Sequence, residues 1–397
     1  MKFGFSRQIR SRDFFIGLFH HHNNEAIMRF LLLSCSTGDG HNSAAKALLE
    51  AAERQGVDAE LRDPVSFGGE RAKRAVAGAY NGMIRRAPRL FGAVYRIGDL
   101  YDRSRLPSPI YAANALYAEE LGRYVKEGGF DAVISTHLYG MESMCAARRK
   151  GSCSAPSFGV LTDYTFVPFF AEPEMEAVFI PHADLTEEGV RKGLDAAKIV
   201  PSGIPVSARF GEEISRKDAR ERLGVADAEK LYLVMSGGVG CENMAKICAA
   251  LVRRIGRDGR IAVLTGRNGK MRAELAQRWR DFPGVCAMGF TDQVALWMKA
   301  ADVTISKAGG LSSTEAAVAG TPLVHIMTIP GCETKNAAFF ASRSMSLRAK
   351  SIGQAAEGAV ALAQDRTEQE RMREAQRANT HCDAADRVIG YVRAYCG

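Results

Sequence analysis

ISKAGGLSSTEAA, residues 305–317, is the stretch of this sequence that decides the fold. The residues before it, 301–305, are apolar and β-branched, and residues 311–319 behind it favour a helix that stops at Gly320. The pattern predicts a strand, a glycine turn and a helix, whose first free N–H groups can bind a diphosphate. Glu315, early in that helix, can accept hydrogen bonds from the two hydroxyls of a ribose. An ordinary strand-to-helix turn with a surface glutamate is the alternative.

Length and composition indicate a globular protein of two domains. The chain has 397 residues, of which 46% are hydrophobic and 25% charged. No apolar run approaches the roughly 20 residues that span a bilayer, which excludes an integral membrane protein. The net charge of +8 favours anionic partners such as nucleotides, nucleic acids or acidic lipids. Nine scattered cysteines without a CxxC pair or a cleavable signal indicate reduced thiols in the cytoplasm.

Residues 1–28 do not share the pattern of the rest of the chain. Their arginines and phenylalanines could form a basic amphipathic helix at a membrane surface. The three consecutive histidines at 20–22 could bind a metal. Met28 directly precedes the first predicted strand. We therefore expect the leader to be disordered or not native, with the native chain starting at Met28.

From Arg29 onward, apolar strands alternate with amphipathic helices. Strands are predicted at 30–35, 57–61, 131–135, 156–161, 231–235, 261–265, 285–288 and 301–305, and helices at 42–54, 244–255, 271–279 and 311–319. Two prolines and a glycine interrupt the alternation at 201–205. The sequence therefore predicts an α/β protein with two Rossmann-like doubly wound domains facing a cleft, at 29–205 and 206–397. The C-terminal helices are expected to pack back across the domains.

The first strand runs into the glycine turn STGDGHNSAA, residues 36–45, which allows three interpretations. A P-loop requires a lysine where His41 stands. A dinucleotide fingerprint would use Ser43 as its third small residue and Asp58 or Glu60 as its acid. In the third interpretation, His41 itself is the functional group, because an imidazole held at a helix start can take a proton from a hydroxyl.

Asp163 follows the strand at 156–161, again at the carboxyl edge of a sheet. It could orient or deprotonate an acceptor, or cap a turn. The loop behind it is unusually apolar and includes Tyr164 and Phe170. Such a loop suits a lipid-like substrate, and packing between the domains is the alternative.

The segment from Arg71 to Arg105 interleaves basic residues with aromatic and aliphatic ones. This composition can hold a segment at an anionic bilayer, with about 1 kcal/mol from each cation near the lipid. RNA binding and a solvated helix face are the alternatives. We favour an anionic membrane surface and no nucleic acid, because no nucleic-acid motif accompanies the segment.

The second half contains further glycine turns at strand ends. They are SGGVG at 236–240 with Gly238, Gly266-Arg267-Asn268, and Gly289-Phe290. After the central stretch, the turn at 329–332 precedes a helix that presents Glu333 and Asn336 one turn apart. A carboxylate and an amide at that spacing can reach the hydroxyls of one sugar, although surface polar residues of a capped helix have the same pattern.

Taken together, these motifs resemble the monogalactosyldiacylglycerol synthase and processive diacylglycerol glucosyltransferase family. The chain is more distantly similar to the lipid-linked N-acetylglucosaminyltransferase of peptidoglycan synthesis. The resemblance covers residues 29 to about 340, and its motifs in family order are TGDGH at 37–41, LTD at 161–163, GIPV at 203–206, SKAGGLS at 306–312 with Glu315, and PGCE at 330–333 with Asn336. It implies the two-domain GT-B glycosyltransferase architecture.

The resemblance also implies site residues. His41 and Asp163 would act on the acceptor, one of them as the base, with Gly38, Gly40, Tyr164 and Phe170 near it. The UDP-sugar would be bound by Gly238, Arg267, Asn268, Gly289, Phe290, Ser306, Lys307, Gly309, Gly310, Leu311, Ser312, Glu315, Glu333 and Asn336. The chain departs from the family at four positions. Ala308 stands where the family usually has proline, Cys332 where it has glutamine, and Val167 and Phe170 where it often has histidine and tryptophan.

We therefore predict an inverting glycosyltransferase that moves a hexose from UDP-glucose or UDP-galactose to a diacylglycerol-type lipid at the inner membrane face. No metal or other cofactor is predicted, and the enzyme is expected to be cytoplasmic and peripheral on the membrane. The alternatives are a UDP-N-acetylglucosamine-using transferase, a non-hydrolysing UDP-sugar epimerase, and a basic nucleotide- or RNA-binding protein.

Overall fold

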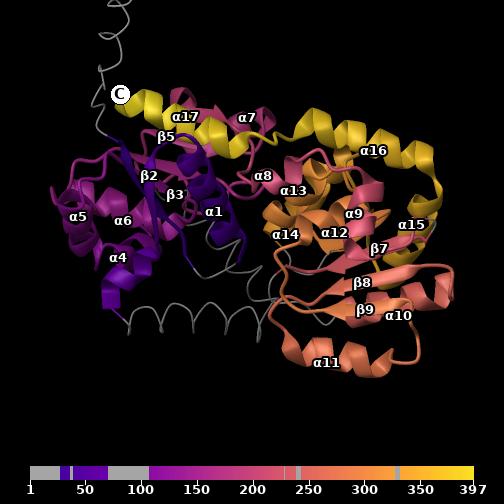
Figure 1. Cartoon of the computed structure of the whole chain (residues 1–397). Coiled ribbons are helices and arrows are strands. Elements are labelled where there is room, and N and C mark those ends of the chain that lie inside the picture. Colours follow the sequence, from indigo (N-terminus) through magenta and orange to yellow (C-terminus); the bar gives the residue numbers. More distant parts are fainter. Residues whose placement is uncertain (1–26, 36–38, 70–106, 228, 238–242, 327–330) are drawn as a thin grey trace, which may run out of the picture.

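The computed structural model describes residues 27–35, 39–69, 107–227, 229–237, 243–326 and 331–397 (Figure 1). Several predicted features lie outside these residues: the leader up to residue 26, the basic segment 71–105, Gly38 and Gly238. Across the ranges that are described, no helix combines the length and the apolarity needed to cross a bilayer.

The N-terminal half forms one sheet of six parallel strands with helices on its faces (Figure 1). The strands are β1 (Arg29–Leu33), β2 (Asp58–Arg62), β3 (Ala132–Ser135), β4 (Ser157–Val160), β5 (Ala177–Ile180) and β6 (Ile199–Pro201). The helices are α1 (Asp39–Arg54), α4 (Pro109–Asn114), α5 (Ala118–Glu127), α6 (Leu138–Arg149) and α7 (Thr186–Lys192). Short 3-10 helices lie at Pro64–Gly68, Ala183–Leu185 and Ala196–Lys198.

The C-terminal half forms a second sheet of six parallel strands. The strands are β7 (Leu231–Met235), β8 (Arg260–Leu264), β9 (Val285–Met288), β10 (Val303–Lys307), β11 (Leu323–Ile326) and β12 (Leu347–Ala349). The helices are α8 (Ala208–Gly211), α9 (Arg216–Leu223), α10 (Asn243–Ile255), α11 (Gly269–Arg278), α12 (Val294–Ala300), α13 (Gly310–Val318), α14 (Cys332–Ser342), α15 (Ile352–Gln364), α16 (Arg366–Asn379) and α17 (Ala384–Cys396). The predicted α/β class with two doubly wound sheets is confirmed.

The order of the strands reverses once in each sheet. The first sheet runs β2-β1-β3-β4-β5-β6, and the second runs β12-β11-β10-β7-β8-β9. Open parallel sheets bind ligands beyond the carboxyl ends of their strands at such a reversal, because the two flanking loops diverge there and leave a crevice. The reversals lie between β1 and β3 and between β7 and β10, which marks two edges where a site can form.

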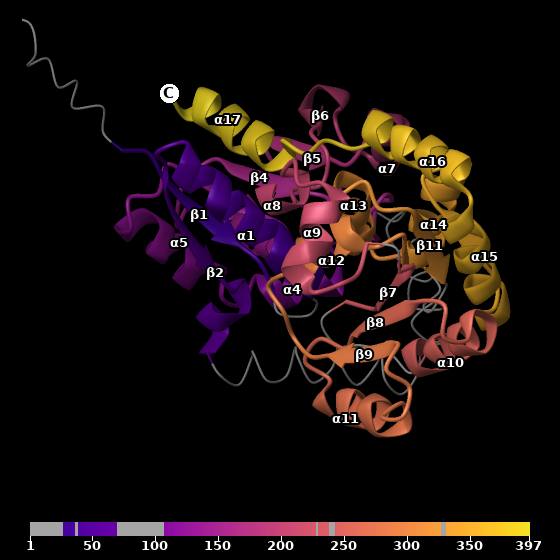
Figure 2. The ribbon, with the colours of Figure 1, turned by 45° about the vertical axis from the view of Figure 1, so that its right-hand side comes forward.

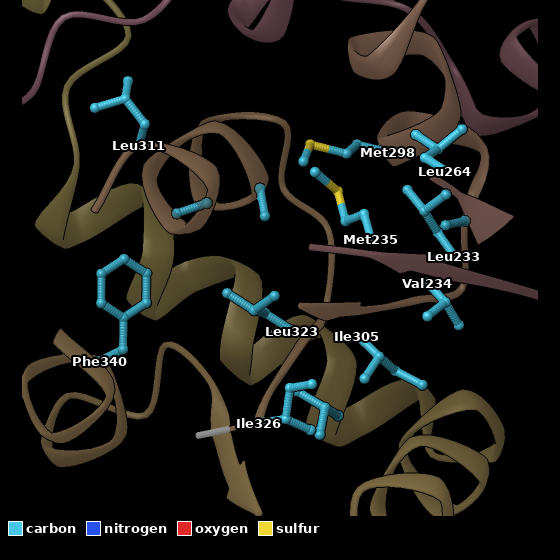
Figure 3. Packing of buried hydrophobic residues seen from close by; sticks show 14 of the residues in the cluster. Leu233, Val234, Met235, Leu264, Met298, Ile305, Leu311, Leu323, Ile326 and Phe340 are labelled. Atoms are coloured by element: carbon cyan, nitrogen blue, oxygen red, sulfur yellow. The ribbon is translucent and has the colours of Figure 1, made fainter. Parts of the chain in front are cut away.

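The central strands of each sheet are buried on both faces, as is usual for parallel sheets. On β1, Phe30 and Leu32 pack with side chains of α1 and α17, whereas Leu31 and Leu33 pack with those of α5 and α6. In the second sheet, Ile305 packs among buried side chains of β7 and β11 (Figure 3). This two-sided burial explains why the central strands read as continuous apolar runs rather than alternating ones.

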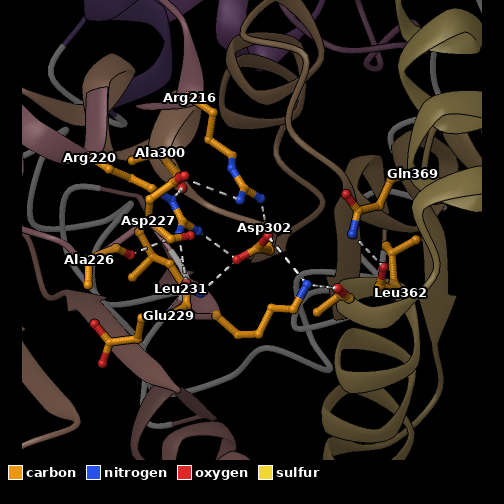
Figure 4. Close-up of polar contacts among 12 residues, drawn as sticks. Arg216, Arg220, Ala226, Asp227, Glu229, Leu231, Ala300, Asp302, Leu362 and Gln369 are labelled. Carbon is orange, nitrogen blue, oxygen red and sulfur yellow. Dashed lines mark hydrogen bonds and ion pairs between the residues drawn. The ribbon is translucent and has the colours of Figure 1, made fainter. Parts of the chain in front are cut away.

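A buried ion cluster fixes the amino end of β10. The carboxylate of Asp302 pairs with Arg216 and, at 2.7 Å, with Nη2 of Arg220, and it accepts the N–H of Leu231 at 2.8 Å (Figure 4). Arg220 donates its remaining hydrogen bonds to the carbonyls of Ala226, Asp227, Glu229 and Ala300. A buried pair whose hydrogen bonds are all made tolerates desolvation. The cluster therefore anchors α9 at the end of β10 opposite to the glycine turn.

The chain crosses between the two sheets twice. After the first crossing, at 202–207, it builds the second sheet, and after α16 it returns so that α17 covers the first sheet (Figures 1 and 2). Val388 and Val392 of α17 are fully buried there, and Asp386 pairs with Arg54 of α1 at 2.8 Å. The C-terminal helix is thus part of the first sheet's core.

Candidate active site

The carboxyl edges of the two sheets meet at the first turn of α13. A Cβ added to Gly310 would lie 2.0 Å from the carbonyl oxygen of Thr162 and 3.0 Å from Cα of Asp163, so this approach requires a glycine. Beside it, Gly40 in the first turn of α1 faces Leu311, whose side chain would lie 3.8 Å from an added Cβ. The amino ends of α1 and α13 therefore adjoin, and their unpaired N–H groups favour an anion between the halves.

His41 lies in the first turn of α1 and is fixed through one ring nitrogen. Its Nδ1 lies 2.8 Å from the backbone oxygen of Thr136 and 2.9 Å from Oγ1 of Thr162. Because a carbonyl oxygen only accepts, Nδ1 carries the hydrogen, and Nε2 keeps the lone pair that can take a proton. Burial lowers the pKa of His41 below its usual 6.5, and the opposing charge of Asp163 only partly offsets this. The imidazole is therefore neutral at pH 7.

His137 is a candidate that the sequence analysis missed. Its ring lies 4.6 Å from that of His41, nearly perpendicular to it, and its Nδ1 accepts the N–H of Tyr139 at 3.2 Å. Burial, together with the neighbouring His41, holds the pKa of His137 well below its usual value, so this ring is also neutral. His137 follows β3 just as His41 follows the end of β1, so a known strand order would have revealed the pair.

Asp163 comes from the loop after β4 and is held by a residue of the other half. Nδ2 of Asn336, on α14, donates to Oδ1 of Asp163 at 2.7 Å. Burial raises the pKa of Asp163 above its ordinary value, whereas the Asn336 bond and the charges of His41 and Lys307 act to lower it. The predicted imidazole and the predicted carboxylate are therefore brought into one site.

Lys307 ends β10 beside the turn at Gly309. Its Nζ binds Oε1 of Glu333 on α14 at 2.9 Å, and its side chain is half-buried while that of Glu333 is almost fully buried. A cation at this position adds to the positive end of α13. The glycine turn, the helix start and Lys307 together form an anion-binding arrangement on the second sheet.

Glu315 lies in the second turn of α13 and is half-buried. Burial raises the pKa of its carboxyl group to about 7. Among the residues that the structure describes, none donates a hydrogen bond to this carboxylate. Two ribose hydroxyls would supply such donors, which is the role predicted from the sequence.

Gly289 and Phe290 follow β9 at the edge of the second sheet. The ring of Phe290 is 71% exposed, the largest exposure of an aromatic side chain among the described residues. An exposed ring beside a glycine can stack on a flat base. This position suits the predicted contact with uracil.

Arg267 and Asn268 make other contacts. Arg267 forms an ion pair with Asp39 of α1 and so links the two halves. The side chain of Asn268 caps α11 by accepting the N–H of Met271 at 3.0 Å. A contact from either residue to a bound nucleotide would have to compete with these bonds.

Two serines predicted to bind the UDP-sugar have little access to a ligand. Ser306 is fully buried inside β10. Ser312 is almost fully buried, and its Oγ lies 3.4 Å from the carbonyl oxygen of Gly309. Diphosphate binding here would rely on backbone N–H groups rather than on these hydroxyls.

The apolar loop after Asp163 packs between the halves. Tyr164 is buried, its hydroxyl lies 2.9 Å from Oγ1 of Thr314, and its ring packs 4.6 Å from that of Phe339. Phe170 is buried against Phe166. Of the two alternatives stated for this loop, packing between the halves accounts for Tyr164, and neither ring lies on an open acceptor surface.

Across the described ranges, no group of three or more His, Cys, Asp or Glu side chains is arranged to hold a metal ion.

Comparison with known proteins gives two family matches that divide the chain. Residues 41–206 match the monogalactosyldiacylglycerol (MGDG) synthase model, and residues 233–388 match the glycosyltransferase family 28 C-terminal domain. The first match begins at His41, and the second contains the whole of β10, α13 and α14. The sequence resemblance to this family is thus confirmed.

Relatives and a solved structure agree with these matches. A processive diacylglycerol beta-glucosyltransferase of Bacillus licheniformis is 24% identical over 80% of this chain and 82% of its own length. A probable chloroplastic monogalactosyldiacylglycerol synthase 2 of Oryza sativa is 27% identical over 83% of this chain and 72% of its own length. A crystal structure of MurG from Acinetobacter baumannii, 17% identical, has a TM-score of 0.61 over 92% of this chain and 99% of that one. The chain therefore belongs to the diacylglycerol glycosyltransferase family that contains the MGDG synthases and the processive diacylglycerol glucosyltransferases, and it is a glycosyltransferase.

Proposed function

We propose that the protein transfers a hexose, glucose or galactose, from its UDP derivative to the free hydroxyl of a diacylglycerol-type lipid, with inversion at the anomeric carbon. Membership of the diacylglycerol glycosyltransferase family supports the classes of donor and acceptor. The observation that carries the mechanism is the position of His41, which follows Gly40 at the contact with α13 and whose Nδ1 is engaged by Thr136, so that the lone pair is on Nε2.

The proposed reaction is a single displacement. Nε2 of His41 takes the proton of the lipid hydroxyl as its oxygen attacks the anomeric carbon, the bond from that carbon to the diphosphate breaks, and UDP leaves with the electron pair. The N–H groups of Gly310 and Leu311 and the ammonium group of Lys307 would stabilise the charge on the leaving diphosphate. In a single displacement the hydroxyl oxygen attacks from the face opposite UDP, and this would invert the configuration.

In this proposal residues 29–205 form the acceptor domain and residues 206–397 the donor domain, with α17 packing back on the acceptor domain. The enzyme binds the inner face of the cell membrane peripherally. The net charge of +8 and the basic composition of segment 71–105 support attraction to anionic lipid. Closure of the two halves would exclude water that could otherwise hydrolyse the donor.

The function is tested with UDP-glucose, UDP-galactose and UDP-N-acetylglucosamine, each offered with vesicles that contain diacylglycerol and an anionic phospholipid. Lipid mass spectrometry is expected to detect a hexosyl-diacylglycerol with one of the first two donors. Conversion of a UDP-sugar to its epimer without lipid would indicate an epimerase instead. Binding to RNA but not to anionic vesicles would favour a nucleic-acid-binding protein.

The affinity for UDP is expected to depend on pH through Glu315. Its carboxyl group has a pKa of about 7 in the free protein, raised by burial, and only the ionised form accepts from both ribose hydroxyls. The dissociation constant for UDP should therefore rise as the pH falls below about 7 and level off above it. Calorimetric titration between pH 5.5 and 8.5 measures this.

Glu315→Gln is the matched variant for that titration. An amide of the same size should bind UDP about tenfold more weakly at pH 8, because a hydrogen bond to a charged acceptor is stronger than one to a neutral acceptor. The same substitution should remove the pH dependence. A dependence that survives in Glu315→Gln would assign the titration to another group.

A further inference from the structure

Asn336 occupies a position between the halves in which every N–H of its amide is used. Asn336 is fully buried. Its Nδ2 donates to Oδ1 of Asp163 at 2.7 Å and to the backbone oxygen of Ala308 at 3.0 Å, and its Oδ1 accepts the N–H of Tyr164 at 2.7 Å. Both side-chain donors therefore already have acceptors.

These three partners also determine which end of the amide is nitrogen. Asp163 and Ala308 present only acceptor oxygens, and Tyr164 presents a donor N–H, so the reverse orientation would place like groups together. A sugar hydroxyl would have to displace one of these bonds to receive a hydrogen bond from Nδ2. The spacing of Asn336 from Glu333 suggested that both contact a sugar. In the folded chain the amide of Asn336 instead bonds to Asp163, Ala308 and Tyr164.

We propose that Asn336 is a positioning residue and not a ligand of the donor sugar. It holds the carboxylate of Asp163 in the orientation in which Asp163 acts, with His41, on the acceptor. This role rests on the proposed transfer reaction. Asp163 comes from the acceptor half, whereas Asn336 and Ala308 come from the donor half. The carboxylate is therefore held in this orientation when the halves are together, and separation of the halves releases it.

The contact with Ala308 extends this link to the diphosphate turn. Ala308 lies directly between Lys307 and Gly309, so one amide joins the carboxylate to the turn that precedes α13. A donor seated at the start of α13 would fix that turn and, through Asn336, the orientation of Asp163. The arrangement couples occupation of the donor site to readiness of the acceptor site.

The role is tested with Asn336→Ala by comparing turnover with binding. The kcat for hexosyl transfer is expected to fall about tenfold or more, since hydrogen bonds to a carboxylate are among the stronger ones. The dissociation constants for UDP and for the UDP-sugar should both stay within about twofold of wild type. A sugar ligand would behave differently: its loss would weaken binding of the UDP-sugar but not of UDP, and that pattern would overturn the proposal.

A pH profile supplies a readout that loss of packing would not change. Asp163 faces His41 from α1, Lys307 from β10 and Glu333 from α14, in addition to Asn336. Removing the Asn336 donor makes the ionised carboxylate less favourable, so the acidic limb of the kcat profile should move to higher pH. Asn114→Ala is the control, because Asn114 is another buried amide, bonded within α4 and to Tyr117. It should lower stability without moving the limb.

A double-substitution cycle covers the case in which Asn336→Ala weakens the fold. In an Asp163→Ala background no carboxylate remains to be positioned, so adding Asn336→Ala should change kcat by less than about twofold. An equal loss of kcat in both backgrounds would mean that Asn336 acts through the fold and would overturn the role. A wild-type enzyme that transfers no hexose would refute the proposed function itself, which distinguishes the two failures.

Discussion

His41→Ala is expected to lower the rate of hexosyl transfer by a factor of about 10² to 10⁴, the usual contribution of a general base. The substitution removes Nε2, the ring nitrogen of His41 that keeps a lone pair, because Nδ1 is engaged by the oxygen of Thr136 at 2.8 Å. Binding of UDP should remain within about twofold of wild type, since the nucleotide is assigned to the other half. Steady-state transfer and calorimetric titration measure the two quantities.

Ser43→Ala is the control for that substitution. Ser43 lies in the same helical turn, and its hydroxyl returns to the carbonyl of Asp39 at 3.0 Å. It should leave the transfer rate unchanged within about twofold. A His41→Ala enzyme that turns over as fast as this control would remove the imidazole from the mechanism.

The pH profile of the wild type follows from the same residue. Burial lowers the pKa of His41 below 6.5, so the neutral base persists into mildly acidic solution. The acidic limb of kcat/KM that reports His41 is therefore expected below pH 6.5. Replacing Asp163 by Asn removes the charge that opposes this effect and should move the His41 pKa, and with it the limb, to still lower pH.

Gly310→Ala is expected to lower transfer by about 100-fold, because a misplacement near 1 Å between reacting groups can cost that much. The added Cβ would lie 2.0 Å from the carbonyl oxygen of Thr162, a backbone atom that cannot swing aside. The halves must then separate at the point where Asp163 and the start of α13 approach each other. Transfer assays, with UDP titration to verify the fold, test this.

Gly269→Ala provides a matched control for the second substitution. Like Gly310, Gly269 is the first residue of a helix, here α11, in the half that contains the second sheet. An added Cβ there meets nothing within 4 Å. Both variants gain the helix propensity of alanine, so this effect cancels between them. Full activity in Gly310→Ala would show that the reacting state does not need the approach seen between α13 and Thr162.

Much of the fold could be predicted from the sequence because the central strands are buried on both faces. The strands predicted at 30–35, 231–235 and 301–305 correspond to β1, β7 and β10, and their ends agree within a few residues. Strands β5 and β6 were not predicted; β6 has only three residues and ends in Pro201, whereas β5, with four residues, is as long as β3 and β4, which were predicted. Strand β11 has a histidine in its middle, and His325 is accommodated only because Ser313 and Ser346 bond its two ring nitrogens, at 2.9 and 3.0 Å. Those partners lie far along the chain.

The candidate site was predictable where one motif supplies a whole feature. The glycine turn before α13 and the imidazole in the first turn of α1 are local features, and local spacing indicates them. His137 was missed because its importance depends on β3 lying beside β1, which the sequence does not state. The partners of Asn336 were missed for the same reason, since Asp163 is far from it in the chain and near it only after both sheets form.

The two crossings between the sheets lie against each other. A Cβ on Gly203, in the first, would approach that of Ala384, just after the second, to 3.0 Å, and one on Gly211 would approach Cβ of Cys382 equally closely. Two adjacent connections define a hinge axis. They permit one half to rotate about the line that joins them, and they resist rotation about other axes and translation of one half along the other. The two halves should therefore open by rotation about this one axis, and the displacement should be largest at the edge farthest from Gly203.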